Sequence, residues 1–442
     1  MRIAPFIILL LVAFSSSAQE TIWESNRSIG LEAYRSYMLP SSSAQEAADL
    51  KPEVMRYAIP LGGWTEQRAE QGGEFTTHFT PPFSWNGRQT IISLAPTYAP
   101  YKLLVGGREV GRNYNSSMPA QFNVTRFMRD DTQNPIVLSV IEDSKVKDLE
   151  SWDGDNKEEL GKVTMLSLPT MYIRDVDVST TLVSDALNVT ISIVVKSEAL
   201  NSRTSRINYE LLTPQGAVDK RGYADMTLEM RGEDTLHLFT IIPDSLAWNV
   251  ETPNLYRLNL STQYRGRHSE YYSLDIGLRS IESGADGSLS INGKPQQLKA
   301  SVVDSSIELS QLDDLKKQGC NIVKIDAGAH NDAIYHYADS IGLMIVATAP
   351  INTKKSGGDI LLGGNPTNDP SRGVEYIERV DAMRNLTKIH PSVVAYAIAD
   401  HSLNGINLYE SYLYLKARET QRPIIYLDGA GQWNSDKLKL DL

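Results

Sequence analysis

The pattern of apolar residues changes near Gly284, and this change limits the chain to a multidomain fold. Before it, short alternating or apolar runs are separated by turn residues such as Pro81-Pro82 and Asn86-Gly87, which is typical of antiparallel sheets. After it, apolar runs alternate with segments of helical periodicity, which predicts parallel βα units, either an open doubly wound sheet or a (β/α)8 barrel. The predicted parallel strands span residues 297–303, 321–326, 343–348, 393–399 and 423–427.

Each part of the chain has a length that suits one domain. We expect a jelly-roll-like β-sandwich over residues 19–170 and an immunoglobulin-like β-sandwich over residues 171–281, where roughly seven strands occupy about a hundred residues. Residues 282–442 are predicted to form a partial TIM-type (β/α) barrel of about five strands. In it, Ser310 and Asn331 are predicted to cap two helices, because both side chains can accept a hydrogen bond from the first turn.

The first residues predict export. Arg2 precedes an apolar run over residues 3–14 that is too short to span a bilayer, and small residues follow at 15–18. This pattern predicts a signal peptide over residues 1–18 and a periplasmic or secreted protein, and a retained anchor helix is the alternative. No cysteine stands at the cleavage position, so a lipid anchor is not expected. No later stretch has the length of a stable membrane span.

Composition disfavours several functions. The formal net charge of −11 argues against a surface that coats nucleic acid. Cys320 is the only cysteine, so an internal disulfide cannot form, and its place before an apolar run predicts a buried thiol. No spacing of cysteine, histidine or carboxylate residues suggests a zinc site. We therefore expect neither a metal nor a cofactor.

Four short motifs follow one another in the second half of the chain. They are residues 248–256 (WNVETPNLY), 276–281 (IGLRSI), 291–295 (INGKP) and 390–402 (HPSVVAYAIADHS). In this order they resemble the W-x-P-E-x-P-x-L-Y, FGIRxI, lNGkp and HPSIIxWSLGNES segments of glycoside hydrolase family 2, the β-galactosidase and β-glucuronidase group. The resemblance covers most of the predicted mature chain. It implies two β-sandwiches followed by a (β/α) barrel. The reaction of the family, against which the residues of this chain can be compared, is hydrolysis of a glycosidic bond.

The family's acid/base position is altered in this chain. A retaining glycosidase needs two carboxyl groups about 5 Å apart, one to donate a proton and one to attack the anomeric carbon. When the motifs are aligned without gaps, Asp400 falls on the family's asparagine and His401 on its acid/base glutamate. An imidazolium can also donate a proton, and Asp400 is a second candidate for the role with a shorter side chain, so we interpret the two as a vestigial acid/base position.

The second catalytic carboxylate has no counterpart in this sequence. The family's nucleophile follows a later barrel strand, beyond the one that residues 422–426 resemble, so we expect a C-terminally truncated barrel with no intact catalytic pair. Lys324 replaces a family arginine, and Asp304 and Asp326 lie near the ends of neighbouring predicted strands. With the acid/base position, they predict a polar pocket for a sugar or another ligand, and solvated loop residues without a ligand are the alternative.

Three functions remain open from the sequence. The expected one is an exported family 2-like protein without catalytic activity that binds carbohydrate or acts as a scaffold. The second is an exo-acting β-glycosidase that uses relocated or partner-supplied carboxylates, and the third is a structural subunit of a cell-envelope complex without sugar binding. Because a partial barrel has two unpaired edge strands, we also expect a homo-oligomer or a protein partner to cover them.

Overall fold

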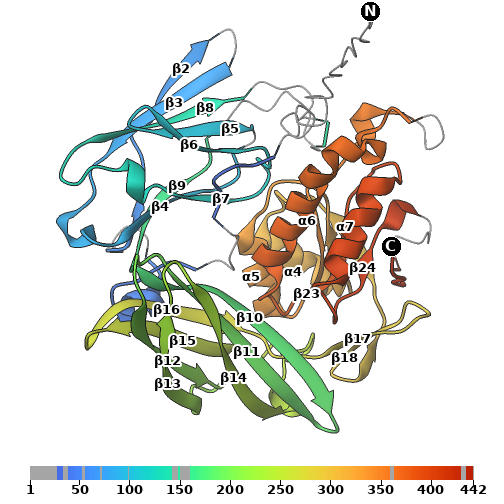
Figure 1. The fold of residues 1–442 in the computed structure, drawn as a ribbon. Coiled ribbons are helices and arrows are strands. Elements are labelled where there is room, and N and C mark those ends of the chain that lie inside the picture. The colour runs from blue at the N-terminus through green and yellow to red at the C-terminus, as the bar shows by residue number, and fades with distance from the viewer. Residues whose placement is uncertain are drawn as a thin grey trace, which may run out of the picture.

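The structure is a computed structural model that describes residues 27–32, 38–51, 55–69, 72–97, 99–141, 148–149, 160–358, 363–429 and 435–441. The predicted signal peptide lies outside these residues. Two β-sandwiches and a parallel βα sheet follow one another along the chain and form three lobes (Figure 1), which confirms the predicted fold class. Among the described residues, no helix combines the length and the apolar character needed to cross a membrane.

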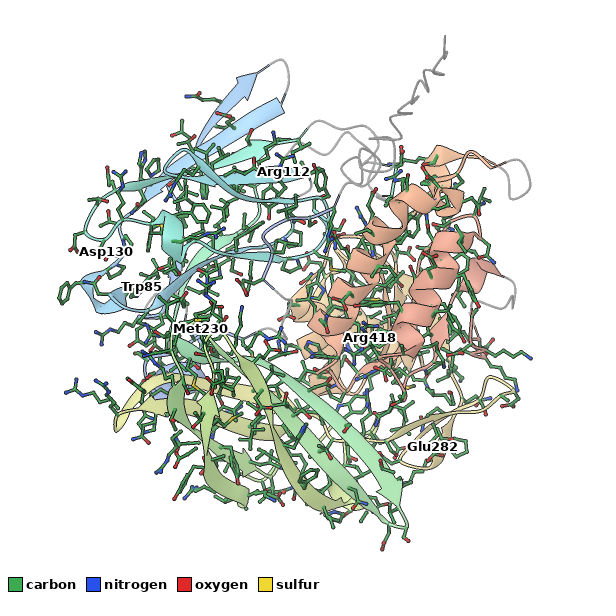
Figure 2. All side chains as sticks on the ribbon, viewed as in Figure 1. Trp85, Arg112, Asp130, Met230, Glu282 and Arg418 are labelled. Carbon is green, nitrogen blue, oxygen red and sulfur yellow. The ribbon has the colours of Figure 1, made fainter. Side chains whose placement is uncertain are left out.

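The first lobe is a sandwich of two antiparallel sheets. One sheet has the order β2-β3-β8-β5-β6 and the other has the order β1-β9-β4-β7. The strands are β1 (Ala58–Pro60), β2 (Thr65–Ala69), β3 (Gly72–Phe79), β4 (Gln89–Leu94), β5 (Tyr101–Val105), β6 (Arg108–Asn113), β7 (Ala120–Asn123), β8 (Asn134–Val140) and β9 (Val163–Leu168). Along β5 every second side chain is buried, and Tyr101, Leu103 and Val105 pack in one core with Trp85. Figure 2 shows the side chains of this lobe, with Trp85 labelled. Each sheet therefore buries one face against the other.

The second lobe packs a three-stranded sheet, β10-β11-β14, on a four-stranded sheet, β13-β12-β15-β16. The strands are β10 (Met171–Val183), β11 (Ala186–Ser197), β12 (Arg203–Leu212), β13 (Val218–Leu228), β14 (Glu233–Pro243), β15 (Tyr256–Tyr264) and β16 (Arg267–Ile276). Ile191, Ile193 and Val195 of β11 enter the core between the sheets, and polar residues alternate with them. This arrangement confirms the predicted immunoglobulin-like sandwich. The short helix α2 (Ala44–Asp49) lies against β16.

The third lobe contains a five-stranded parallel sheet with the order β20-β21-β22-β23-β24. Its elements are β20 (Ala300–Val303), α4 (Leu309–Lys317), β21 (Ile322–Ile325), α5 (Asp332–Ile341), β22 (Met344–Thr348), α6 (Gly373–Thr387), β23 (Val393–Ala397), α7 (Ile406–Lys416) and β24 (Ile424–Ile425). All five strands lie within their predicted ranges. Asn331 caps α5 as predicted. The prediction for Ser310 is wrong, because the N-cap of α4 is Glu308, two residues earlier, and Glu308 forms a capping box with Gln311.

Both faces of the parallel sheet are covered by other parts of the chain. The helices α4 to α7 cover one face, where Val323, Ile345 and Tyr396 are buried (Figure 1). Trp248, residues 438–440 and a small antiparallel meander cover the opposite face. The meander consists of β17 (Ile281–Ser283), β18 (Leu289–Ile291) and β19 (Lys294–Gln296). Because both faces of the sheet are shielded from water, the strands are apolar almost throughout.

The outer strands of this sheet are partly bonded to residues 435–441 of the same chain. Asp436 donates its backbone N–H to the carbonyl oxygen of Ile424 on β24, at 2.7 Å. Asp441 donates its backbone N–H to the carbonyl oxygen of Leu298, just before β20, at 2.9 Å. The sequence predicted edges that need a partner, whereas this segment contacts both edges from within the chain. A second copy or another protein at the edges remains a prediction.

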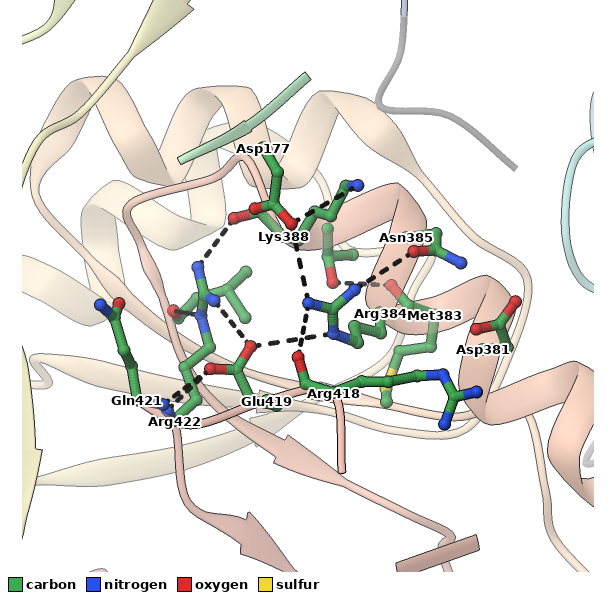
Figure 3. A network of polar contacts seen from close by, with 12 residues as sticks. Asp177, Asp381, Met383, Arg384, Asn385, Lys388, Arg418, Glu419, Gln421 and Arg422 are labelled. Atoms are coloured by element: carbon green, nitrogen blue, oxygen red, sulfur yellow. Dashed lines mark hydrogen bonds and ion pairs between the residues drawn. The ribbon is translucent and has the colours of Figure 1, made fainter. Parts of the chain in front are cut away.

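Buried ion pairs join the middle sandwich to the helical layer (Figure 3). Lys388, directly after α6, contacts Asp175 of β10 and lies 3.8 Å from Asp177 Oδ2. Arg422 Nη1 lies 3.0 Å from Glu419 Oε2 in the same network. Such pairs are costly to break, because removing one partner leaves a buried charge without water or counter-charge. The network therefore fixes the position of the helices on the sandwich.

Candidate functional site

The predicted site lies at the carboxyl end of the parallel sheet, where βα scaffolds place their functional groups. Lys324 is the third residue of β21 and shares a sheet face with Ile322. Its ammonium Nζ lies 2.9 Å from Asp326 Oδ1 and 3.1 Å from Asp400 Oδ1. Asp326 follows β21 and Asp400 follows β23. One lysine thus joins the ends of two strands.

Burial differs among these three groups. The side chains of Lys324 and Asp400 are 5% and 7% exposed, whereas that of Asp326 is 35% exposed. Burial nevertheless raises the pKa of Asp326, the neighbouring Asp400 adds to the rise, and the Lys324 ammonium opposes it. Asp326 therefore retains a proton more readily than a fully hydrated aspartate.

His401 occupies the position predicted for the acid/base group but lies at the rim of the site, with 54% of its side chain exposed. Its backbone has a left-handed φ of 41°, and its N–H donates to Asp428 Oδ2 at 2.7 Å. The ring atom Nε2 lies 3.8 Å from Asp400 Oδ1, and Nδ1 lies 3.9 Å from Asp428 Oδ2. The exposed imidazole of His401 therefore lies between the carboxylates of Asp400 and Asp428.

Asp428 joins the site although the sequence analysis did not select it. It lies in the 3-10 turn η8 (Leu427–Gly429), directly after β24. One ligand atom from each of Asp400, His401 and Asp428 lies within 4.8 Å of the others, a spacing at which side chains can hold a metal ion. The Lys324 ammonium already bonds to Asp400 and repels a cation. The position of Asp428 just past a predicted strand is the sequence signal that could have identified it.

Asp304 makes different contacts from the other predicted residues. Its Oδ1 accepts a hydrogen bond from the backbone N–H of Ser306 at 2.7 Å, which closes its own turn. It lines a groove of about 540 Å³ beside β20, together with Val302 and Ile307. The structure thus brings together the other four predicted residues, and a ligand role for any of the five remains a prediction.

Two β-sandwiches, followed by a parallel βα sheet with polar groups at its carboxyl edge, define a multidomain scaffold of the kind that carries enzyme sites, and the fold alone does not fix a function. The sequence model described as Glycosyl hydrolases family 2 matches residues 171–279. The model described as Glycosyl hydrolases family 2, TIM barrel domain, matches residues 295–441, and the two together cover more than half of the chain. The chain is a glycoside hydrolase family 2-like protein.

Relatives with this scaffold are longer than this chain. A β-galactosidase of Pectobacterium atrosepticum is 24% identical over 401 residues, which is 85% of this chain and 37% of the relative. A β-galactosidase of Priestia megaterium is 23% identical, over 80% of this chain and 36% of the relative. The chain thus spans little more than a third of the length of these relatives.

Solved structures show the same fold at lower sequence identity. A β-glucuronidase of Bacteroides uniformis superposes with a TM-score of 0.66 at 16% identity, covering 90% of this chain and 52% of that protein. A structure described as a putative β-galactosidase from Bacteroides fragilis superposes with a TM-score of 0.68 at 12% identity, covering 92% and 65%. At these identities the likeness concerns the fold alone.

Proposed function

We propose that this protein is exported and that its scaffold binds carbohydrate, or serves as an interaction component, without cleaving glycosidic bonds. One observation carries the proposal: the carboxylates of Asp326 and Asp400 converge on the single ammonium of Lys324. Export to the periplasm or the medium is supported by the signal-peptide pattern of residues 1–18.

The arrangement of these carboxylates differs from that of a glycosidase pair. A retaining enzyme holds two carboxyl groups about 5 Å apart on opposite sides of the scissile bond, and an inverting enzyme holds them roughly 6.5–9.5 Å apart. Here the carboxylates of Asp326 and Asp400 both contact the ammonium of Lys324, so a cationic group already lies between them. These groups can bind a hydroxyl group, but they do not flank a linkage.

The exposed groups of the site suit the hydroxyl groups of a sugar. Asp428 and His401 face solvent, and the carboxylate of Asp326 is partly accessible beside them. A carboxylate accepts hydrogen bonds from hydroxyl groups, and an imidazole can donate or accept one. The rim therefore offers several polar contacts to one sugar ring.

Hydrolysis assays test the absence of catalysis. Chromogenic β-galactosides, β-glucuronides and β-mannosides are incubated with the protein at high concentration. The expected result is no turnover above that of a denatured sample. Turnover that disappears in Asp326→Asn would overturn the proposal and identify Asp326 as a catalytic group.

That outcome would support the second candidate, a β-glycosidase with relocated carboxylates. The observation that favours it is the raised pKa of Asp326 next to Asp400. Acid and base roles arise where two neighbouring carboxyl groups have different environments. Here the side chain of Asp326 is 35% exposed, whereas that of Asp400 is 7% exposed.

Glycan-array binding followed by calorimetric titration tests the binding role. Asp428→Asn is expected to weaken the binding of a sugar identified on the array. Asp304→Asn is the matched control, because its amide oxygen can still accept the bond from Ser306 and its groove lies beside β20. Equal effects of both variants would contradict a site centred on Lys324 and Asp428. Absence of binding to every glycan would leave the role of a structural subunit, which is the third function.

A further inference from the structure

A cluster of histidines and one carboxylate lies at the start of α5, on a part of the chain that the proposed function does not use. Asp332 is the first residue of α5, and His336 follows one turn later on the same face. His390 reaches the cluster from the loop before β23. Single ligand atoms of these three side chains lie within 4.8 Å of one another.

His390 is the buried histidine of the cluster, and it is held in a fixed orientation. Its Nδ1 lies 2.6 Å from Asp339 Oδ2, and the other oxygen of Asp339 accepts the backbone N–H of Ser392 at 3.0 Å. A hydrogen on Nδ1 directed at Asp339 leaves Nε2 as the nitrogen that can bind an ion, and ion binding would displace any proton held there. A carboxylate behind a histidine is the usual support of a histidine that ligates a metal.

Two of the atoms that face one another across the cluster lack hydrogen bonds, although His336 Nε2 lies 3.0 Å from Asp332 Oδ2. Only 1% of the His390 side chain is exposed, so its Nε2 has no access to bulk water. This atom lies 3.7 Å from Asp332 Oδ1, which is beyond hydrogen-bond distance. Among the described residues, neither atom has a hydrogen-bond partner. Two buried polar atoms left in this way call for a third species between them.

We propose that Asp332, His336 and His390 bind a divalent transition-metal ion, with zinc as the best match. Two imidazole nitrogens and one carboxylate are a ligand set that zinc uses with a water molecule in the fourth position. Calcium and magnesium prefer oxygen ligands and are poorly served by two histidines. Zinc bonds of about 2.0–2.1 Å place tetrahedral ligand atoms roughly 3.4 Å apart. The contacts of Asp332 with His336 and His390, at 3.0 and 3.7 Å, lie on either side of this spacing.

A fourth nitrogen stands next to the cluster. His330 Nε2 lies 3.6 Å from Asp332 Oδ1, and its ring stacks on Tyr335 of α5 with centroids 5.2 Å apart. The backbone N–H of His330 donates to the carbonyl oxygen of Ser117 in the first lobe, at 2.8 Å. His330 can therefore complete the coordination or position the water molecule.

The site lies where the third lobe meets the first. His330 and Asp332 line a cavity of about 190 Å³ that is also lined by Leu94, Gln121 and Thr164 of the N-terminal sandwich. This cavity gives the fourth metal position access to water. An ion bound here would join the start of α5 to the loop before β23 that carries His390.

Titration of the full chain with ZnCl2 after chelator treatment tests the proposal. We expect one zinc ion per chain, and visible absorption bands on substitution with CoCl2 that report nitrogen ligands. His336→Ala should weaken zinc binding at least tenfold, since even supporting residues of a metal site contribute about that much. The side chain of His336 is 50% exposed, so its removal leaves the core intact.

His401→Ala is the matched control, because its side chain is 54% exposed and belongs to the other cluster of possible ligands. This variant should bind zinc as the unaltered protein does. Absence of stoichiometric zinc binding would overturn the proposal. So would equal affinities of His336→Ala and the unaltered protein, or a loss confined to His401→Ala. The circular dichroism of each variant establishes that it is folded.

Discussion

Arg279 donates a hydrogen bond from Nε to the carbonyl oxygen of Pro391, at 2.6 Å, across 112 residues of sequence. Its Nη2 donates a second bond to the carbonyl oxygen of Val393, at 2.7 Å. Arg279 is buried between the middle sandwich and the parallel sheet. These bonds join the motif of residues 276–281 to that of residues 390–402, which gives a physical reason for both motifs to occur together.

We expect Arg279→Lys to lower the free energy of unfolding by about 3 kcal/mol, because a lysine replaces the planar fork and leaves a buried carbonyl oxygen without a donor. Urea unfolding followed by tryptophan fluorescence measures the loss. Arg257→Lys is the control, since that side chain is largely exposed and pairs with the exposed Asp275. Similar losses in the two variants would contradict the role given to the buried bonds.

Lys324→Met tests the ion bridge at the sheet edge. The variant leaves the carboxylates of Asp326 and Asp400 together without their counter-charge, and we expect a loss of about 3 kcal/mol in the free energy of unfolding at neutral pH. The pKa of Asp326 is already raised by burial and should rise further without the ammonium. A carboxyl group whose pKa is higher in the folded state favours folding as the pH falls. The deficit of the variant should therefore shrink in acid.

Lys317→Met is the control for this experiment, because Lys317 pairs with Asp314 on the surface of α4. It should change the urea midpoint little at any pH, since exposed pairs contribute little. A deficit of Lys324→Met that does not depend on pH would mean that lost packing, rather than the ion bridge, is measured.

Glu419→Gln tests the network between the helices and the middle sandwich. Burial alone would raise the pKa of Glu419, but Arg422 and the backbone N–H groups of Gln421 and Arg422 outweigh it, so the pKa lies below the ordinary 4.5. A carboxylate with a lowered pKa stabilises the fold above its unfolded pKa and loses this effect as the pH falls through the folded value. We expect the variant to be less stable than the unaltered protein at neutral pH.

The difference in urea midpoint between Glu419→Gln and the unaltered protein should then narrow as the pH falls below 4.5. Glu251→Gln, at an exposed position, should follow the unaltered protein at every pH. If the gap between Glu419→Gln and the unaltered protein stays constant down to the acid transition, Glu419 is not charged in the folded state.

The strands of all three lobes were predictable because burial shapes their sequences directly. β11 has one buried face and alternates, whereas β22 is covered on both faces and is apolar up to its last residue, Thr348. The order of the lobes could be predicted from the four short motifs, because residues of these motifs make contacts between one lobe and the next. Trp248, for example, donates its indole N–H to the carbonyl oxygen of Asp339 on α5, at 2.8 Å.

The parts that sequence reasoning missed depend on contacts between distant residues. The pairing of residues 435–441 with the outer strands could not be predicted from the pattern of residue types, because backbone groups make these hydrogen bonds. The cluster at α5 was only half visible: Asp332 and His336 have helical spacing, but His390 lies more than fifty residues further on. Asp304 was placed correctly at a strand end, yet its side chain closes its own turn.

The predicted partner at the sheet edge has one feature in its favour. Val302 of β20 is 49% exposed and lies in the groove beside this strand with Ile307 and Leu315. An exposed apolar side chain on an outer strand is a common point of association, because association removes it from water. Residues 435–441 contact the residues next to β20, so the remaining exposed part of the edge is short.

We expect the purified protein to self-associate through this part of β20, and Val302→Asp to shift it to a monomer, because a carboxylate at the contact would lose its hydration. Light scattering coupled to gel filtration at micromolar concentrations measures the mass. Val183→Asp, at the exposed end of β10, is the matched control and should keep the mass of the unaltered protein. A monomer before any substitution would show that the contacts of residues 435–441 suffice to cover the edge. Equal effects of both substitutions would place the association elsewhere.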